Sequence, residues 1–521
     1  MARSRRILTL IGAAVIATVA LAGCAGTAGA GAAGGSKTLR LAYLGDIPAP
    51  DPDTAYASPE LALVNSAYEG LIAYQSGVNT AKLEPVLATD WKVDPTNTVF
   101  TFDLRKGVTF HDGTPFDASA VKASFDRRTA VNQGPAYMVA GVKSVDAPTD
   151  HQVVITLKAP NSAFLAYLAS PFGPKMMSPT ALKAHAANNG TDYFDTHDAG
   201  TGAYEYGTFK KGTSYDLTAY PKYWGAAPKY SAVDFTVVSN VSTVQLEIEG
   251  GQLDGIIGFG DKQALATYKT DSTLNTYEFP SLQTPTLFLN PKSASFTDQA
   301  TRVSLLSGLD FPSIASKALG STGKSTTEVF PPTMIDAAGD QQTIAHNASA
   351  LSSLASGALS GASLKIGYMA QSPAGQALAE NIAAELNAAK ISAKTISYPN
   401  GTFYSTMADA ATAPDLAVLT GYPDTAHPDS WARIFYTPAG GLDLYGTEIP
   451  GVAAQLDAML VSGDPAGYSQ VAHEVSASGY FYSLGTVLGT AVLNKSVTGA
   501  DKAWNLVVPD LLDLKLLAPK A

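Results

Sequence analysis

Cys24 is the only cysteine in the chain, and the residues before it indicate what its thiol could do. Three arginines near the N-terminus precede an apolar run over residues 7–21, and the small residues Ala22 and Gly23 follow directly. This order is typical of a secretory signal, and the run is too short to span a membrane. Because a thiol can form a thioether with diacylglycerol, we expect a lipoprotein signal peptide over residues 1–23 and a lipid anchor on Cys24. The alternative is an ordinary signal with a cysteine nearby by chance.

Other residue patterns that could carry out chemistry are incomplete. Residues 320–325 (GSTGKS) are similar to a phosphate-binding loop, but that pattern needs a glycine at position 318, where this chain has Ala318. The seven histidines include no HExxH motif and no close pair, which argues against a zinc site. Glu247 and Glu249 precede a Gly-Gly turn, which favours a solvated helix end, and no nucleophile elbow is present. The sequence therefore predicts a protein that is not an enzyme, without a metal or a cofactor.

Composition limits the class of protein further. The chain has 521 residues, 46% of them hydrophobic and 15% charged, and a formal net charge of −11. An acidic chain without a basic run argues against nucleic acid as a partner. A single cysteine allows no internal disulfide. The length exceeds what one core needs, so we expect two or three packed units.

The elements that must position any site begin after residue 36. Residues 24–36 are almost entirely glycine and alanine and predict a flexible tether. Residues 37–44 then alternate as a strand does, and Asp117 can cap a helix that begins near Ala118. We predict a hairpin over residues 99–110, with its turn at Lys106-Gly107. Further strands are predicted at 151–159, 216–220, 231–239 and 415–422.

A βαβ unit is the clearest local pattern in the second half of the chain. Residues 363–370 form a predicted strand, 375–389 an amphipathic helix and 390–398 another strand. Such a unit argues for a partly parallel sheet. No internal repeat is visible.

Three stretches together resemble a known family. The first comprises AYEGLIAYQSG (67–77) and the Trp-, Phe-His-Asp-Gly- and Ser-Phe-containing run over residues 83–127. The second is residues 200–225, with Ala203 where the family usually has proline. The third is residues 288–310, followed by phenylalanine where the family usually has arginine. In this order the motifs resemble family 5 of the extracellular solute-binding proteins, the oligopeptide-, dipeptide- and nickel-binding group, over nearly the whole mature chain.

The resemblance implies a fold. It is an α/β fold like that of the periplasmic binding proteins, of the class II or cluster C type. Two α/β lobes would be joined by crossing segments around a hinged cleft, with an extra domain inserted in the first lobe. The implied division is lobe I over residues 37–60, 190–279 and 480–521, the inserted domain over 61–189, and lobe II over 280–479.

The resemblance also implies site residues. Asp424, counted back from Pro428, aligns with the acidic residue that holds the peptide α-ammonium, although it could instead stiffen a Pro-rich loop. A buried carboxylate needs a partner, and a ligand ammonium supplies charge and donors. The backbone of Thr420 and Tyr422 would pair with an extended peptide. The remaining implied ligand-binding residues are Tyr56, Ala57 and Ser58 on the opposing lobe, and Trp431, which could equally belong to the core. No arginine can be assigned to a ligand carboxylate, so the ligand length stays open.

The function implied by the resemblance is that of a substrate-binding subunit of an ABC importer. The chain would be a monomer, anchored by lipid at the extracytoplasmic face of the cell membrane, with export by the general or the twin-arginine route left open. It would capture di- to oligopeptides and deliver them to the permease and ATPase subunits. One alternative is the same fold with haem, a nickel chelate, an opine or a sugar as the ligand. Another is an exported hydrolase or assembly protein.

Overall fold

The computed structural model describes residues 37–521 except for 239, 260, 336–340 and 410–411. The predicted signal peptide, Cys24 and the predicted tether lie outside the described residues. Within the described part of the chain, no helix is long and apolar enough to cross a membrane. That part contains a seven-stranded, a five-stranded and a four-stranded sheet, together with three two-stranded pairs.

The seven-stranded sheet contains the first and last strands of the three large sheets. Its spatial order is β12 (Leu274–Phe279), β20 (Gly489–Asn494), β11 (Gly255–Ile257), β1 (Thr38–Tyr43), β10 (Ala232–Val237), β9 (Ser214–Ala219) and β8 (Tyr204–Lys210). Strand β1 is parallel to both of its neighbours, β10 and β11. Leu39 and Leu41 are fully buried, as the alternation in residues 37–44 predicts. The predicted strands at 37–44, 216–220 and 231–239 are thus confirmed. Helices α7 (Val241–Glu249) and α8 (Lys262–Tyr268) share a core cluster with this sheet.

The five-stranded sheet contains the predicted βαβ unit. Its order is β16 (Ser392–Tyr398), β15 (Ser363–Met369), β17 (Leu416–Gly421), β13 (Thr284–Leu289) and β18 (Phe481–Ser483). Strands β15 and β16 are parallel and are connected by α12 (Pro373–Ala388), so this prediction is confirmed. Strand β15 is also parallel to β17, whereas β13 runs antiparallel to β17.

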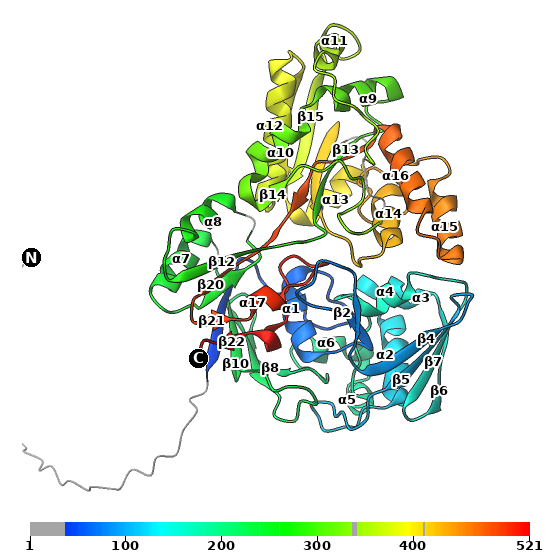
Figure 1. The fold of residues 1–521 in the computed structure, drawn as a ribbon, viewed down its shortest axis with the longest axis vertical. Helices are drawn as coiled ribbons and strands as arrows, with labels where there is room; N and C mark the ends of the chain where they lie inside the picture. Colours follow the sequence, from blue (N-terminus) through cyan, green and yellow to red (C-terminus); the bar gives the residue numbers. More distant parts are fainter. Residues whose placement is uncertain (1–36, 239, 260, 336–340, 410–411) are drawn as a thin grey trace, which may run out of the picture. The chain divides into compact units, whose positions relative to one another are not determined.

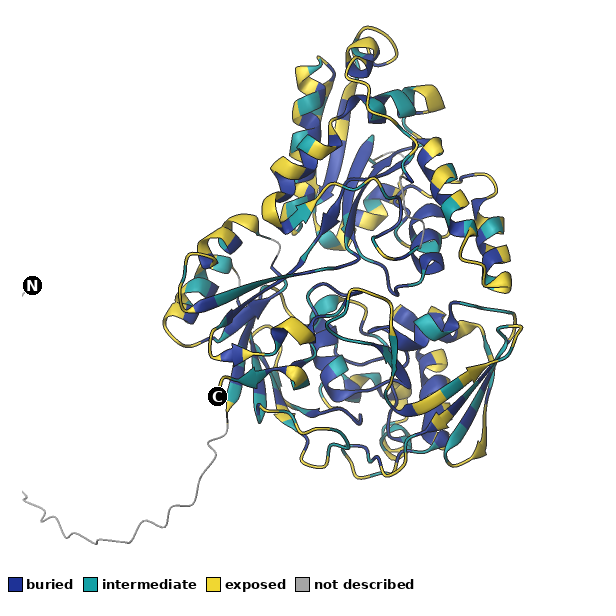
Figure 2. Ribbon diagram, in the orientation of Figure 1, coloured by how far each residue is buried: buried dark blue, intermediate teal, exposed yellow. Residues whose placement is uncertain are grey.

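Alternate residues of the central strands bury against different helices. Leu287 and Val418 belong to a core cluster with α12, whereas Phe288 and Leu419 belong to the cluster that contains Trp431. Both faces of the sheet are therefore covered, which explains why β17 is a continuous apolar run. Figure 2 shows these central strands as buried. The other helices around this sheet are α9 (Gln299–Gly308), α10 (Phe311–Leu319), α11 (Ala350–Ser356), α13 (Asn400–Ala408), α14 (Pro428–Tyr436), α15 (Val452–Ser462) and α16 (Gly467–Ser478).

The four-stranded sheet corrects one prediction. Its order is β4 (Ala88–Val93), β5 (Val99–Leu104), β7 (Gln152–Leu157) and β6 (Val142–Thr149), all antiparallel. The predicted hairpin over residues 99–110 is wrong, because β5 pairs with β4 and β7 and the chain then leaves the sheet. Gly107 does adopt a turn conformation with φ of 75°. Val108 and Phe110 are buried, and their segment forms an isolated antiparallel bridge with residues 114–116 and not with residues 99–104. The Val108 carbonyl accepts from the Phe116 N–H, and Thr109 is bridged to Pro115.

Helix α2 (Ala118–Val131) packs on this sheet and begins as predicted. The Asp117 carboxylate accepts hydrogen bonds from the backbone N–H groups of Ser119 (2.9 Å) and Ala120 (3.2 Å). The remaining helices of the chain are α1 (Ser58–Ala67), α3 (Tyr137–Ala140), α4 (Phe164–Ala169), α5 (Pro179–Ala184), α6 (Thr191–Phe194) and α17 (Ala500–Ala503).

Replacing Asp117 by alanine should lower the free energy of unfolding by about 1 kcal/mol, because two helix N–H groups lose their acceptor. Chemical denaturation measures this change. Asp126→Ala on the same helix is a matched control, since its ion pair with Lys122 is exposed and should contribute less than about 0.5 kcal/mol. Equal losses from the two variants would contradict the capping role.

Two segments connect the seven-stranded sheet to the five-stranded sheet. Residues 280–283 lead from β12 to β13, and residues 484–488 lead back from β18 to β20 (Figure 1). The segments are bonded to each other: the Val487 N–H donates to the Gln283 carbonyl (3.0 Å) and the Ser281 hydroxyl donates to the Val487 carbonyl (2.6 Å). Strand β19 (Thr486–Val487) in the returning segment also pairs with β14 (Gly323–Lys324). The crossing is therefore a hydrogen-bonded unit.

Candidate functional site

A cavity of about 470 Å³ is lined by residues from both large sheets and from the two connecting segments. Five of the seven predicted ligand-binding residues lie on its wall, namely Tyr56, Ala57, Ser58, Thr420 and Tyr422. The structure thus brings together residues that are more than 360 positions apart in the sequence. Asp424 and Trp431 are not among the lining residues.

On one side, the cavity lies at the carboxyl ends of three parallel strands. Residues 371–374 follow β15, Asn400 and Tyr404 follow β16, and Tyr422 follows β17, and all of them line the cavity. The carboxyl ends of parallel strands are the usual place for ligand sites in α/β sheets, because the loops there are free to vary. Tyr404 is 40% exposed and presents its ring at the surface.

On the other side, the wall comes from the seven-stranded sheet. Gly258 and Phe259 directly follow β11, and Gly489 and Thr490 begin its antiparallel neighbour β20. Residues 56–59 lead into α1. The floor between the two sides includes Gln283, Val487 and Leu488 of the connecting segments.

The loop that carries Tyr56, Ala57 and Ser58 is fixed by carboxylates. Glu60 Oε2 accepts hydrogen bonds from the backbone N–H groups of Tyr56 (2.8 Å) and Ala57 (3.0 Å). Glu60 Oε1 accepts a further bond from the Ala49 N–H (3.2 Å). These bonds hold the loop in place before α1 begins.

A buried network of ion pairs holds the residues just before this loop against α2. Asp51 and Asp53 precede the loop, and both pair with arginines of α2. Arg127 bridges the two carboxylates, with its guanidinium nitrogens 2.5 Å from Asp51 and 2.7 Å from Asp53. Arg128 bonds Asp53 (2.8 Å) and two backbone carbonyls, those of Pro52 and Phe172. All four charged side chains are almost completely buried.

Asp424 lies next to the cavity but is covered by two tyrosines. The hydroxyl groups of Tyr56 and Tyr137 both donate to Asp424 Oδ2, the latter at 2.5 Å. Only 7% of Asp424 is exposed. Burial raises the pKa of its carboxyl, and the two tyrosine hydrogen bonds act against that rise. Tyr56 is the link between this carboxylate and the cavity, because its side chain touches both.

Thr420 and Tyr422 lie at the end of β17, where one edge of the strand is free. Pairing of β17 with β13 continues to Gly421, but its pairing with β15 ends at Val418. The backbone after Val418 is thus paired on the β13 side only. Trp431, by contrast, is fully buried in α14, stacked on Phe435, and its indole N–H donates to the Tyr436 hydroxyl (2.8 Å).

Asp510 is a lining residue that the sequence did not reveal. The Ser58 hydroxyl donates to Asp510 Oδ2 (2.7 Å), whereas the buried Oδ1 receives no hydrogen bond from another described residue. Burial raises the pKa of its carboxyl. The only sequence signal is a lone acidic residue in the apolar run LVVPDLL (506–512), which no motif marks.

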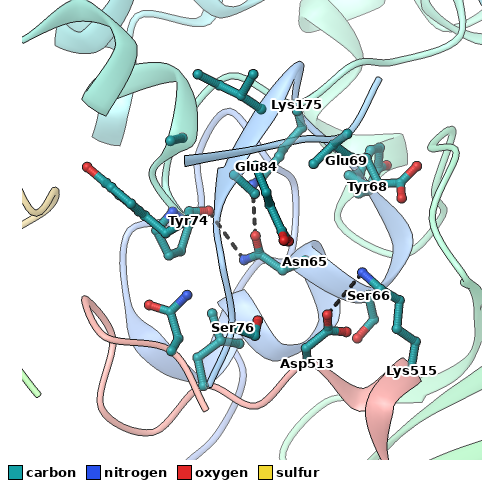
Figure 3. A pocket seen from close by; sticks show the side chains of 18 of the residues that line it. Asn65, Ser66, Tyr68, Glu69, Tyr74, Ser76, Glu84, Lys175, Asp513 and Lys515 are labelled. Atoms are coloured by element: carbon teal, nitrogen blue, oxygen red, sulfur yellow. Dashed lines mark hydrogen bonds and ion pairs between the residues drawn. The ribbon is translucent and has the colours of Figure 1, made fainter. Parts of the chain in front are cut away.

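A second, smaller cavity of about 100 Å³ lies between α1, β2 (Ile72–Tyr74), β3 (Leu83–Pro85) and the C-terminal segment. Figure 3 shows Lys175 and Lys515 on its wall together with Glu69 and Asp513. The Lys175 ammonium donates to Asn65 Oδ1 (2.7 Å), and Lys515 pairs with Asp513 (3.0 Å). Burial lowers the pKa of Lys175 to about 7.

The buried Lys175 should make the free energy of unfolding rise with pH, and a neutral residue at this position should abolish that rise. Its pKa is about 7 in the folded state and 10.5 in the unfolded chain, so at neutral pH the unfolded state binds the proton more tightly. Burying the protonated Lys175 therefore lowers the free energy of unfolding. This loss of stability is largest below pH 7 and disappears as the pH rises toward 10.5. Between pH 7 and 9 the wild type should therefore gain about 2 kcal/mol relative to Lys175→Met. Denaturant unfolding at a series of pH values measures this difference; a constant difference would show that Lys175 stays charged.

Within the described part of the chain, no group of three or more His, Cys, Asp or Glu residues is arranged to hold a metal ion. Residues 82–443 match the family model for bacterial extracellular solute-binding proteins, family 5 middle. The chain belongs to family 5 of the bacterial extracellular solute-binding proteins. The match covers the four-stranded sheet and most of the five-stranded sheet, which contribute the Asp424 site.

The chain is also similar to a curated relative and to several solved structures. A probable D,D-dipeptide-binding periplasmic protein of Escherichia coli (strain K12) is 28% identical over 283 residues. The match covers 54% of this chain and 54% of the relative, so it spans about half of that protein's length. The crystal structure of an ABC transporter substrate-binding protein of Listeria monocytogenes has a TM-score of 0.82 at 18% identity, over 93% of this chain and 99% of that one.

A periplasmic binding protein of Helicobacter pylori, in complex with the peptide STSA, has a TM-score of 0.78 at 19% identity, over 93% of this chain and 98% of that one. At these identities the structural likeness establishes the fold. The predicted periplasmic-binding-protein fold of class II type is confirmed.

Proposed function

We propose that this family 5 protein is the substrate-binding component of an ABC importer and that it binds peptides in the 470 Å³ cavity. The observation that carries the proposal is the cavity itself, which lies between the ends of two sheets and beside two connecting segments. Its volume lies within the range of about 300–1,000 Å³ that is common for small-ligand sites. The peptide complex of the Helicobacter pylori protein supports peptides as the class of ligand.

The free edge of β17 supports binding through the ligand backbone. Thr420 near the end of β17 and Tyr422 just after it line the cavity, and beyond Val418 no described strand pairs with β17 on the β15 side. An extended peptide can add there as a further strand, and its main-chain hydrogen bonds give affinity without reading side chains. Tyr56 and Tyr404, both at least 40% exposed, offer aromatic faces at the same cavity.

Asp424 is the proposed partner of the peptide α-ammonium. A ligand ammonium that reaches Asp424 would replace neutral tyrosine donors by a cation, and charge-assisted hydrogen bonds are about twice as strong as neutral ones. Tyr56 must move or share the carboxylate for this to happen, because its hydroxyl bonds Asp424 now. Trp431 would then act as a buried support of α14 behind this loop.

The remaining parts of the proposal concern the whole protein. The chain would be a monomer, held by a lipid on Cys24 at the extracytoplasmic face of the cell membrane, and would pass its ligand unchanged to permease and ATPase subunits. We also propose the division into lobe I, inserted domain and lobe II predicted from the sequence. Sheet membership supports it: all seven strands of the first sheet fall in the proposed lobe I, and only β18 of the five-stranded sheet falls outside the proposed lobe II.

Calorimetry with a mixed library of di- to pentapeptides tests the proposal. We expect saturable binding and no change of the peptides on recovery. Mass spectrometry of the protein under native conditions would show any cargo that it retains on purification. If no peptide binds, and haem or nickel–histidine binds instead, peptides are not the class of ligand.

A further inference from the structure

The charge of the cavity wall restricts which ligands can bind, provided that the cavity is the site proposed above. Among the lining residues that the structure describes, Asp510 is the only acidic residue, and none is a lysine, arginine or histidine. Asp424 lies directly behind Tyr56 and adds a second carboxylate. Asp424 lies in the loop after β17, and Asp510 lies in the C-terminal segment beside Gly258, which follows β11. No described cationic side chain lines the cavity with them.

Asp510 is poorly satisfied where it stands. Its Oδ2 accepts one neutral hydroxyl, from Ser58, and its buried Oδ1 receives no donor from another described residue. The hydroxyl of Tyr43, which is 5% exposed, also has no hydrogen-bond partner among the described residues. Burial raises the pKa of Tyr43, and the nearby charge of Asp510 raises it further. A buried carboxylate oxygen without a donor costs about 1–3 kcal/mol or more, and a cationic N–H donor would relieve that cost. The structural carboxylates of this region have donors on both oxygens: Asp53 is bonded by two arginines and Glu60 by three backbone N–H groups.

The cavity offers little to a ligand carboxylate. Among the described residues, its wall carries only the partial positive charges of helix N-termini: α1 reaches it at Ser58 and α13 at Asn400. The third is α12, whose N-cap is Ser372 and whose first residue is Pro373. Proline has no N–H, and the Ser372 hydroxyl already accepts from the Gly375 N–H (3.1 Å). A carboxylate placed here would be a third negative charge beside Asp424 and Asp510, with no counter-ion on the wall.

We infer that Asp510 is a second cation-binding residue and that the cavity selects basic peptides, with the α-ammonium at Asp424 and a cationic side chain at Asp510. Two cations on the ligand would balance two carboxylates, one in the loop after β17 and one in the C-terminal segment. A free carboxyl terminus contributes nothing to this arrangement. Binding of such a ligand also links the two sheets through its own charges.

Tripeptides with lysine at each position in turn test the inference, each compared with the norleucine peptide of the same shape. Every peptide is used both as the acid and as the C-terminal amide, and 1,5-diaminopentane serves as a probe that is not a peptide. We expect the best lysine peptide to bind at least about tenfold more tightly than its norleucine counterpart, as a charged hydrogen bond would give. Amidation should not weaken binding.

Three variants assign the effect to Asp510. Asp510→Asn should remove the preference for lysine, whereas Asp501→Asn, which changes an exposed residue of α17 by the same charge, should retain it. Asp457→Asn removes the same charge from an exposed residue of α15, away from the cavity, so it should also retain the preference. Unfolding midpoints show that each variant is folded.

The outcomes separate this inference from the proposed function. Equal binding of lysine and norleucine peptides, a preference that survives in Asp510→Asn, or a need for the free carboxyl terminus would overturn the inference and leave peptide binding intact. Binding of diaminopentane alone, lost in Asp510→Asn, would support Asp510 and overturn peptides as the ligand. If no probe binds, both this inference and the proposed peptide-binding function are overturned.

Discussion

Replacing Arg128 by methionine should lower the free energy of unfolding by about 3–5 kcal/mol, the usual cost of breaking a buried ion pair by removing one partner. Arg128 is completely buried and forms hydrogen bonds to Asp53 and to the carbonyls of Pro52 and Phe172. Methionine fills a similar volume but donates to none of the three acceptors. Asp53 would keep only its bond to Arg127, and the carbonyls would lose these donors inside the protein.

Chemical denaturation with Arg40→Met as the control measures this effect. Arg40 also pairs with an aspartate, Asp254 at 2.8 Å, but 41% of its side chain is exposed, so the control should lose about 1 kcal/mol or less. Combining Arg128→Met with Asp53→Asn should cost less than the sum of the single changes, because the two residues share one interaction. A loss below 1 kcal/mol in Arg128→Met would show that the network contributes little to stability.

Asp424→Asn should weaken peptide binding by about 2–5 kcal/mol, which corresponds to about 30-fold or more in Kd. The asparagine keeps the shape and one acceptor oxygen, but a buried ammonium loses its counter-charge. The unliganded protein should not lose stability, because burial raises the pKa of Asp424 and so already disfavours its charged form. The binding constant and the unfolding midpoint are both measured for each variant.

Asp457→Asn is the matched control for this prediction. Its side chain is 72% exposed on α15, so the change removes the same charge without reaching the cavity. Its binding constant should equal that of the wild type. Unchanged affinity in Asp424→Asn would show that the ammonium binds elsewhere, and Asp510 is then the carboxylate to examine first.

Local patterns in the sequence predicted local structure well. The period of the apolar residues gave the βαβ unit around α12, and Asp117 gave the start of α2. The predicted hairpin failed because alternating burial does not say which strand a segment pairs with. The residues that pair with β5 lie 7–16 positions away in β4 and 49–57 positions away in β7.

The site could be predicted only in part, because its residues meet through the tertiary fold. The family resemblance named Asp424 and Tyr56, and the structure places them in hydrogen-bond contact. It did not name Tyr137 or Asp510, since neither belongs to a motif that marks a site. The orphaned Oδ1 of Asp510 and the low pKa of Lys175 follow from burial, and no sequence period encodes how deeply a charged group is buried.

Residues 280–283 and 484–488 have two roles. In the described part of the chain, they are the only segments that lead from a strand of the seven-stranded sheet to a strand of the five-stranded sheet or back. They also contribute Gln283, Val487 and Leu488 to the cavity floor. A substitution at Gln283 or Leu488 that changes the cavity floor therefore also changes the segments that connect the two sheets. Under the proposed function, the ligand preference of the cavity is therefore coupled to the connection between the two sheets. We therefore expect substitutions that adapt the protein to a new ligand to occur in the loops after β15 and β16, because changes there do not affect the connecting segments.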